Sequence, residues 1–177
     1  NDEGGDAGAA PTSADVIVFD ADCDNNMTID ANIDVAGVQI DSGYSGVITQ
    51  NSTRTIRVRS SDWTQADGTF TGNDANIDID DDFTMTGGTF TDSSALTAIA
   101  GDFDTSAGGT FDATSNSGTV TFDGGDATID VNGTETFYNL TVDKSNYAIQ
   151  TISAGDTLIV NNNLSLSDGR LQGEKIQ

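Results

Sequence analysis

The chain has 177 residues, of which 29 are acidic, 6 are basic and none is histidine, so its formal net charge at pH 7 is −23. Binding of nucleic-acid phosphates depends on Lys and Arg, and this balance therefore argues against a nucleic-acid partner. No apolar run approaches the roughly 20 residues of a membrane-spanning helix, so no membrane insertion is expected. The absence of histidine also excludes a Ser-His-Asp triad and His-ligated zinc.

Two parts of the chain differ in composition. Residues 1–14 are small, acidic and rich in glycine, which predicts a flexible acidic leader. Residues 15–177 are expected to form a single domain. Near residue 164 a further repeat begins and then stops without a polar cap, so we expect the domain to continue into, or contact, another chain at its C-terminal end.

Short runs with alternating apolar residues follow the leader, and helical periodicity is nearly absent. Each run places apolar side chains two residues apart and is bounded by Gly, Asn or Asp, which is typical of a half-buried strand. The predicted strands, in chain order, are Val16–Phe19, Ile33–Val35, Val38–Ile40, Ile56–Arg59, Ile77–Asp80, Val120–Phe122, Ile129–Val131, Leu140–Val142 and Leu164–Leu166.

An internal repeat of about 20 residues runs through these strands. Phe83 and Phe103 are 20 residues apart, Phe90 and Phe111 are 21 apart, and G-T-F ending at Phe70 precedes G-T-F ending at Phe90 by 20. Gly87 and Gly88 are predicted to form a corner of the coil. A third copy is predicted in which three leucines take the places of Phe83, Met85 and Phe90: Leu164, Leu166 and Leu171.

A repeat of this length without a helix predicts an all-β fold, a right-handed parallel β-helix or β-solenoid of about eight coils with roughly 20 residues per coil. One coil cannot bury its own apolar face, whereas stacked coils place like residues above like and form a continuous core. A β-sandwich is the alternative, because it is also built of short alternating strands joined by turns.

Several segments resemble the repetitive β-helical modules of large exported bacterial surface proteins: P-T-S-A-D-V-I-V-F-D (11–20), I-D-S-G-Y-S-G-V-I-T-Q (40–50), G-T-V-T-F-D-G-G-D-A-T-I (118–129) and G-T-E-T-F-Y-N-L-T-V (133–142). This resemblance covers most of the chain and its motifs are structural. It implies an extracellular or cell-surface location and a scaffold or adhesive role, and it carries over no catalytic residues.

Two groups of aspartates are candidate calcium ligands. Carboxylates at alternate positions offer the hard oxygen atoms that Ca²⁺ prefers, and stacked coils would bring them close enough to repel one another without a cation. The candidates are Asp20, Asp22 and Asp24 in D-A-D-C-D and Asp78, Asp80 and Asp82 in I-D-I-D-D-D. The alternative is a plain acidic surface.

Half of the basic residues lie within six positions, at Arg54, Arg57 and Arg59. We expect Arg57 and Arg59 to project from one outer face, where they would either pair with Asp residues of a neighbouring coil or bind the acidic surface of another subunit.

The expected function is that of a non-enzymatic, extracellular structural or adhesive surface protein that assembles into a filament through uncapped ends. A carbohydrate-binding adhesin is the alternative, with Trp63, Tyr44, Tyr138 and Tyr147 as candidate stacking residues, although isolated aromatic residues in a β protein are more often part of the core. A polysaccharide-degrading enzyme that uses paired carboxylates is the weaker third hypothesis.

Overall fold

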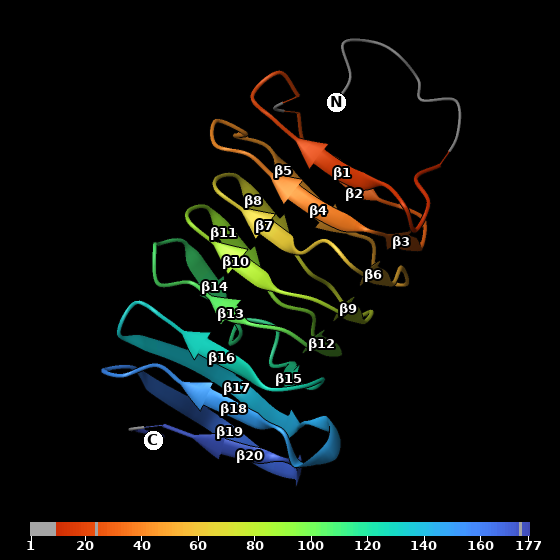
Figure 1. The fold of residues 1–177 in the computed structure, drawn as a ribbon. Helices are drawn as coiled ribbons and strands as arrows, with labels where there is room; N and C mark the ends of the chain where they lie inside the picture. The colour runs from red at the N-terminus through yellow and green to blue at the C-terminus, as the bar shows by residue number, and fades with distance from the viewer. Residues whose placement is uncertain (1–9, 24, 174) are drawn as a thin grey trace.

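The computed structural model describes residues 10–23, 25–173 and 175–177, so positions 1–9 of the predicted leader and the calcium candidate Asp24 lie outside the described residues. The chain forms a parallel β-solenoid of about seven turns with about 21 residues per coil, consistent with a right-handed parallel β-helix (Figure 1). Every strand ladder among the described residues is parallel, which confirms the predicted fold class and excludes the antiparallel β-sandwich.

Three sheets run along the solenoid axis, and each coil contributes one short strand to each of them over most of the length. Sheet A contains β1 (Val16–Phe19), β4 (Gly37–Ile40), β7 (Trp63–Gln65), β10 (Phe83–Met85), β13 (Phe103–Asp104), β16 (Ala127–Asp130), β18 (Ile149–Ile152) and β20 (Arg170–Gln172). Sheet B contains β2 (Met27–Ile29), β5 (Val47–Gln50), β8 (Thr69–Thr71), β11 (Thr89–Thr91) and β14 (Thr110–Asp112).

Sheet C contains β3 (Ile33–Val35), β6 (Ile56–Val58), β9 (Ile77–Ile79), β12 (Leu96–Ile99), β15 (Thr119–Phe122), β17 (Thr134–Asp143) and β19 (Thr157–Asp168). β17 and β19 are long strands, and an isolated bridge between Ala113 and Phe137 links the beginning of β17 to the coil of β14. The beginnings of these two strands therefore extend the stack on the side of sheet B. A single 3-10 turn, η1 (Ser145–Tyr147), separates β17 from β18.

The core consists of columns of inward side chains that run from coil to coil. In sheet B, Phe70, Phe90 and Phe111 lie directly above one another in register. The rings of Phe70 and Phe90 are 4.7 Å apart between centroids, and those of Phe90 and Phe111 are 5.3 Å apart, both in stacked orientation. In sheet A, Phe83 pairs with Phe103 in the same way. The residues that the repeat aligned are therefore paired in the structure, and the predicted repeat is confirmed at these positions. Their side chains share the inward face because alternating residues of a strand point to opposite faces.

The predicted third copy of the repeat is wrong. Leu164 and Leu166 lie in sheet C, where they pair with Leu140 and Val142, whereas Phe83 and Met85 belong to sheet A. Leu171 lies in sheet A opposite Gln150, not in sheet B with Phe90. A sequence period identifies equivalent positions only while the turns keep a constant length, and the long strands β17 and β19 break that condition.

The predicted corner at Gly87 and Gly88 is confirmed. A Cβ atom on Gly87 would lie 2.2 Å from the carbonyl oxygen of Ala66 in the preceding coil, and Gly88 has a φ of +71°, a left-handed conformation that favours glycine. Two successive coils pass each other closely at this corner.

Candidate functional site

Aspartates at the corner between sheets C and A connect successive coils. Oδ1 of Asp62 accepts a hydrogen bond from the backbone N–H of Asp82 (3.3 Å), and Oδ1 of Asp82 accepts one from the N–H of Asp102 (2.7 Å). Oδ1 of Asp102 in turn accepts a hydrogen bond from the N–H of Thr128 (2.7 Å). We call Asp62, Asp82 and Asp102 the corner ladder. These carboxylates satisfy backbone donors at the coil corner, which explains much of the aspartate content there.

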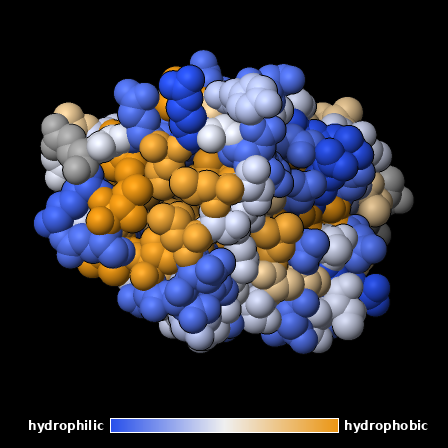
Figure 2. Space-filling model, turned by 90° about the horizontal axis from the view of Figure 1, so that it is seen from below, coloured by the Kyte–Doolittle hydropathy of each residue, from blue (hydrophilic) through white to orange (hydrophobic). Residues whose placement is uncertain are grey.

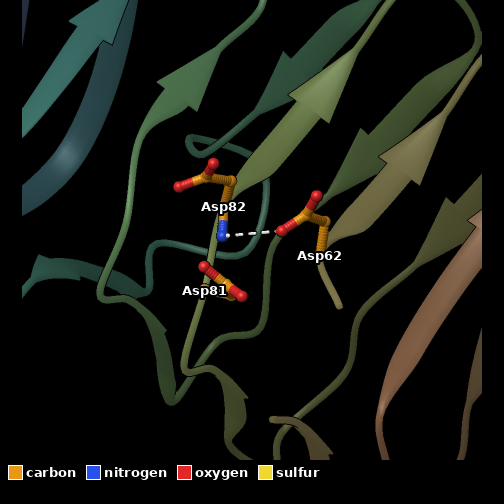
Figure 3. Close-up of side chains that lie close together, drawn as sticks. All are labelled: Asp62, Asp81 and Asp82. Atoms are coloured by element: carbon orange, nitrogen blue, oxygen red, sulfur yellow. Dashed lines mark hydrogen bonds between the residues drawn. The ribbon is translucent and has the colours of Figure 1, made fainter. Parts of the chain in front are cut away.

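Two members of the corner ladder, Asp62 and Asp82, lie close to a third carboxyl group, that of Asp81. Asp62, Asp81 and Asp82 form the one group of at least three potential metal-ligating side chains found within the described residues, with ligand atoms within 4.8 Å of one another (Figure 3). Burial raises the pKa of Asp81, and the neighbouring carboxylates of Asp62 and Asp82 raise it further. The group offers hard oxygen ligands, but Ca²⁺ takes six to eight oxygens and two of these side chains already accept backbone hydrogen bonds.

Of the five described aspartates that were predicted to bind calcium, only Asp82 belongs to this group. Asp78 lies on the outer face of β9 and Asp80 follows that strand, and both lie against Arg57. Asp20 accepts a hydrogen bond from the N–H of Asp22 within a turn, at 3.1 Å. The alternation of aspartates along I-D-I-D-D-D does not continue past residue 80, because the chain turns the corner into sheet A there.

The pattern-based prediction missed Asp62 and Asp81. Asp62 precedes Asp82 by 20 residues, the same separation that aligns Phe83 with Phe103, so the repeat itself contained the signal that could have identified it. Asp81 lies in the same aspartate run as Asp80 and Asp82 and carries no comparable signal.

The arginine cluster makes ion pairs within the chain. Nη2 of Arg57 lies 2.7 Å from Oδ2 of Asp80, and Arg59 forms a two-pronged contact with Asp34. The hydrogen bonds from Arg59 lower the pKa of Asp34. Arg54 differs from both, because its Nε atom is buried without a hydrogen-bond partner among the described residues. Arg57 and Arg59 therefore connect neighbouring coils of sheet C. This agrees with the expectation that they pair with Asp residues of a neighbouring coil.

Two of the four candidate sugar-stacking aromatic residues are core residues. Trp63 and Tyr44 are almost fully buried, and Trp63 packs edge-on against Phe70 and Phe90. Tyr147 in η1 is largely exposed. The aromatic residues therefore do not form one exposed platform.

The two end faces of the solenoid are apolar. On the N-terminal end, Val16, Met27, Ile29 and Ile33 help to line an apolar cavity of about 460 Å³. On the C-terminal end, the exposed fractions of Leu164, Leu166 and Ile176 are 39%, 58% and 42%. Figure 2 views the molecule from this end and shows a broad apolar area there, rimmed by polar residues.

The exposed leucines of the C-terminal face occupy core positions. Leu164 lies over Leu140, which is fully buried, and Leu166 lies over Val142, which is fully buried as well. Because alternate residues of a strand share a face, Leu164 and Leu166 point the same way as the core residues beneath them. One more strand on the outer edge of β19 would cover both.

Within the described part of the chain there is no helix with the length and apolar character that crossing a membrane requires. No family model, no curated protein and no solved structure matches the chain. The geometry of the described residues is therefore the basis for assigning it a function.

Proposed function

We propose that the chain is an extracellular structural or adhesive module that associates end to end into a filament. The observation that carries this proposal is that the inward columns of the core reach the surface on both end faces. On one face they end at Ile17 and Met27, which pair with the buried Val38 and Ile48, and on the other they end at Leu164, Leu166 and Ile176. Exposed apolar faces with a polar rim are typical of interaction surfaces, and the outer strand of a sheet is a template for another strand.

The two end faces fit each other in register. β3 is the first strand of sheet C and β19 is the last. Ile33 and Val35 of β3 start the same two columns that end at Leu164 and Leu166. When β3 of a second copy pairs with β19, the half-buried Ile33 lies over Leu164 and their column continues across the junction. Val35 takes the position over Leu166, although its own side chain is already buried within its chain. A head-to-tail contact of this kind repeats without closing, and it therefore produces a filament.

Charge also favours this pairing. Residues 1–53 contain no Lys or Arg, so the N-terminal coils are uniformly acidic. Two of the six basic residues, Arg170 and Lys175, lie in the last coil, beside the C-terminal face. Complementary charge sets orientation and partner choice more than affinity, and it favours the head-to-tail contact over a contact between two N-terminal faces.

The location outside the cell is supported by the resemblance to modules of exported surface proteins. The structural role is supported by the continuous aromatic core and the backbone ladders along the axis, which make a stacked-coil rod stiff. In this proposal the function is mechanical, and adhesion occurs through lateral faces of the filament.

Sedimentation velocity and negative-stain electron microscopy test the proposal with two variants of equal charge. Leu166→Asp places a carboxylate in the proposed junction, whereas Thr121→Asp places one on the outward face of β15, in the middle of sheet C. We expect the unaltered chain and Thr121→Asp to form elongated particles of growing length, and Leu166→Asp to remain monomeric. An unaltered chain that stays monodisperse at every concentration and salt level would refute end-to-end assembly.

A further inference from the structure

A carboxyl group occupies a core position of sheet B at Asp92. The register of β5, β8, β11 and β14 places Asp92 in one inward column with Gln50 and Gly72 on earlier coils and Ala113 on the next coil. The side chain of Asp92 is fully buried. Gly72 and Ala113 are small, and a Cβ atom on Gly118 would lie 3.1 Å from Oδ2 of Asp92, so the carboxyl group is closely enclosed.

Asp92 differs from the other polar residue of this column in its hydrogen bonds. Nε2 of Gln50 donates to the carbonyl oxygens of Arg54 and Ala75, and its Oε1 accepts the N–H of Asn73. Within the part of the chain that the structure describes, neither carboxyl oxygen of Asp92 has a hydrogen-bond partner. An ionised carboxylate without partners is costly in a protein interior, whereas the protonated form is tolerated much better.

A second carboxyl group lies in the neighbouring inward column. The bridge between Ala113 and Phe137 places Glu135 one coil after Phe111 in that column. On the next coil, Glu135 pairs with Leu158, which is fully buried. Its side chain is partly buried, and Oε1 accepts the backbone N–H of Thr136 at 2.9 Å. Asp92 and Glu135 thus stand at positions where most other coils carry apolar or small residues.

The charges around both groups are negative. Asp112 projects from β14, on the coil between Asp92 and Glu135. Burial raises the pKa of Asp92 to about 7, and Asp112 contributes to the increase. Burial also raises the pKa of Glu135 to about 7, with the Thr136 N–H opposing and Asp112 adding to it. Among the described residues, no basic side chain lowers the pKa of Asp92 or of Glu135.

We propose that Asp92 and Glu135 make the stack formed by sheet B and the beginning of β17 a proton-dependent element. The stack is fully packed when both side chains are protonated, and it loosens at the corner after β11 and at the beginning of β17 when they ionise. This device is independent of end-to-end assembly. It adds a response to pH in the range around neutrality to a fold whose other inward columns are mainly apolar.

The sign of the pH dependence follows from the direction of the pKa shift. The folded-state pKa of Asp92 lies above its unfolded value of 3.8, so the stabilising effect is complete below that value and is lost as the pH rises through about 7. Between the unfolded and the folded pKa of Asp92, each pH unit raises the unfolding constant by up to tenfold. The two pKa values differ by about three units, so the ionisation of Asp92 raises the unfolding constant by at most roughly a thousandfold.

Urea unfolding between acid and mildly alkaline pH tests the proposal with Asp92→Asn and, as a control of equal charge change, Asp74→Asn on an exposed turn. We expect the unfolding constant of the unaltered chain to rise with pH, Asp74→Asn to follow it, and Asp92→Asn to lose on the order of a hundredfold or more of that rise. Equal pH profiles for all three chains would overturn the proposal. Repeating the series in the Leu166→Asp chain separates this result from self-association.

Carboxyl carbon NMR of the unaltered chain keeps the test valid if Asp92→Asn does not fold. We expect Asp92 and Glu135 to titrate near neutrality, and titration below about pH 5, together with exposed carboxylates, would contradict the proposal. Hydrogen exchange locates the loosening. Three backbone amides hold the corner by hydrogen bonds to neighbouring coils, those of Asp92 (3.0 Å), Ser94 (2.7 Å) and Thr119 (3.2 Å). Their protection from exchange should fall above neutrality, whereas the protection of the Ala66 amide, directly after β7 of sheet A, should persist.

Discussion

Oδ1 of Asp82 accepts the backbone N–H of Asp102, which lies 2.7 Å away and 20 residues later in the chain. Asp62 makes the same contact with the N–H of Asp82. An aspartate carboxylate thus accepts the backbone N–H that precedes the strand of sheet A on the next coil, in place of a backbone carbonyl oxygen. Aspartate recurs at this position because the same backbone N–H recurs on each of these coils.

Substitution of Asp82 by alanine should destabilise the fold, because it leaves the N–H of Asp102 without its acceptor. By analogy with the loss of a helix cap, we expect a loss of about 1 kcal/mol in the free energy of unfolding. Asp82→Asn keeps an Oδ1 acceptor and should retain most of the stability. Urea denaturation midpoints measure the difference, and equal losses for the two variants would show that the charge, not the hydrogen bond, matters.

Substitution of Phe90 by alanine should be among the most damaging changes in the core. Its ring is fully buried, stacks on Phe70 and Phe111, and meets Phe83 edge-on with a centroid distance of 5.0 Å. Truncation of a buried phenylalanine costs about 3–5 kcal/mol. Thr91→Ala, on the outward side of the same strand, should change the free energy of unfolding by about 0.5 kcal/mol or less. Comparable losses in thermal unfolding would contradict the assigned register.

Calcium binding at Asp62, Asp81 and Asp82 can be tested through Asp81. Unlike the carboxylates of Asp62 and Asp82, its side chain accepts no hydrogen bond from a neighbouring coil among the described residues. Because burial and two neighbouring carboxylates raise the pKa of Asp81, Asp81→Asn without calcium should be slightly stabilising, by about 0.5 kcal/mol or less. If the cluster binds calcium, millimolar Ca²⁺ raises the melting temperature of the unaltered chain but not that of Asp81→Asn. A melting temperature that neither Ca²⁺ nor a chelator moves would remove the calcium hypothesis.

Self-association should strengthen with salt. With a net charge of −23, copies of the chain repel one another at low ionic strength. The screening length falls from about 8 Å at 0.15 M to about 3 Å at 1 M, so added NaCl weakens this repulsion while leaving the apolar contact of the end faces intact. Sedimentation velocity across this range should show growing particles for the unaltered chain and monomers for Leu166→Asp. Particles that shrink as salt increases would indicate a junction dominated by ion pairs instead.

Much of the fold could be predicted from the sequence because the strands are short and their apolar residues alternate. Phe70, Phe90 and Phe111 align by simple spacing, and the structure places them in one column. The placement of Leu164 and Leu166 could not be predicted in the same way. The repeat aligned them with Phe83 and Met85 of sheet A, whereas they lie in sheet C. The number of residues in a coil depends on its turns, so a fixed spacing does not always lead to the same sheet.

The candidate site was less predictable than the fold. Alternation along I-D-I-D-D-D suggested that Asp78, Asp80 and Asp82 share a face, yet the chain turns after Asp80, and only Asp82 meets Asp62. Asp92 carries no signal in the sequence, because an aspartate after a G-T-F strand looks like an ordinary turn residue until the register places it in the core column.

Composition and periodicity by themselves determined a histidine-free, strongly acidic chain of stacked short strands, because both properties are local and repeat along the chain. Only the tertiary structure decided which aspartates support the corners, that Asp92 is buried without a hydrogen-bond partner among the described residues, and where the apolar columns reach the surface. These properties depend on contacts between residues about 20 positions apart, and a change of one or two residues in a turn shifts every such contact.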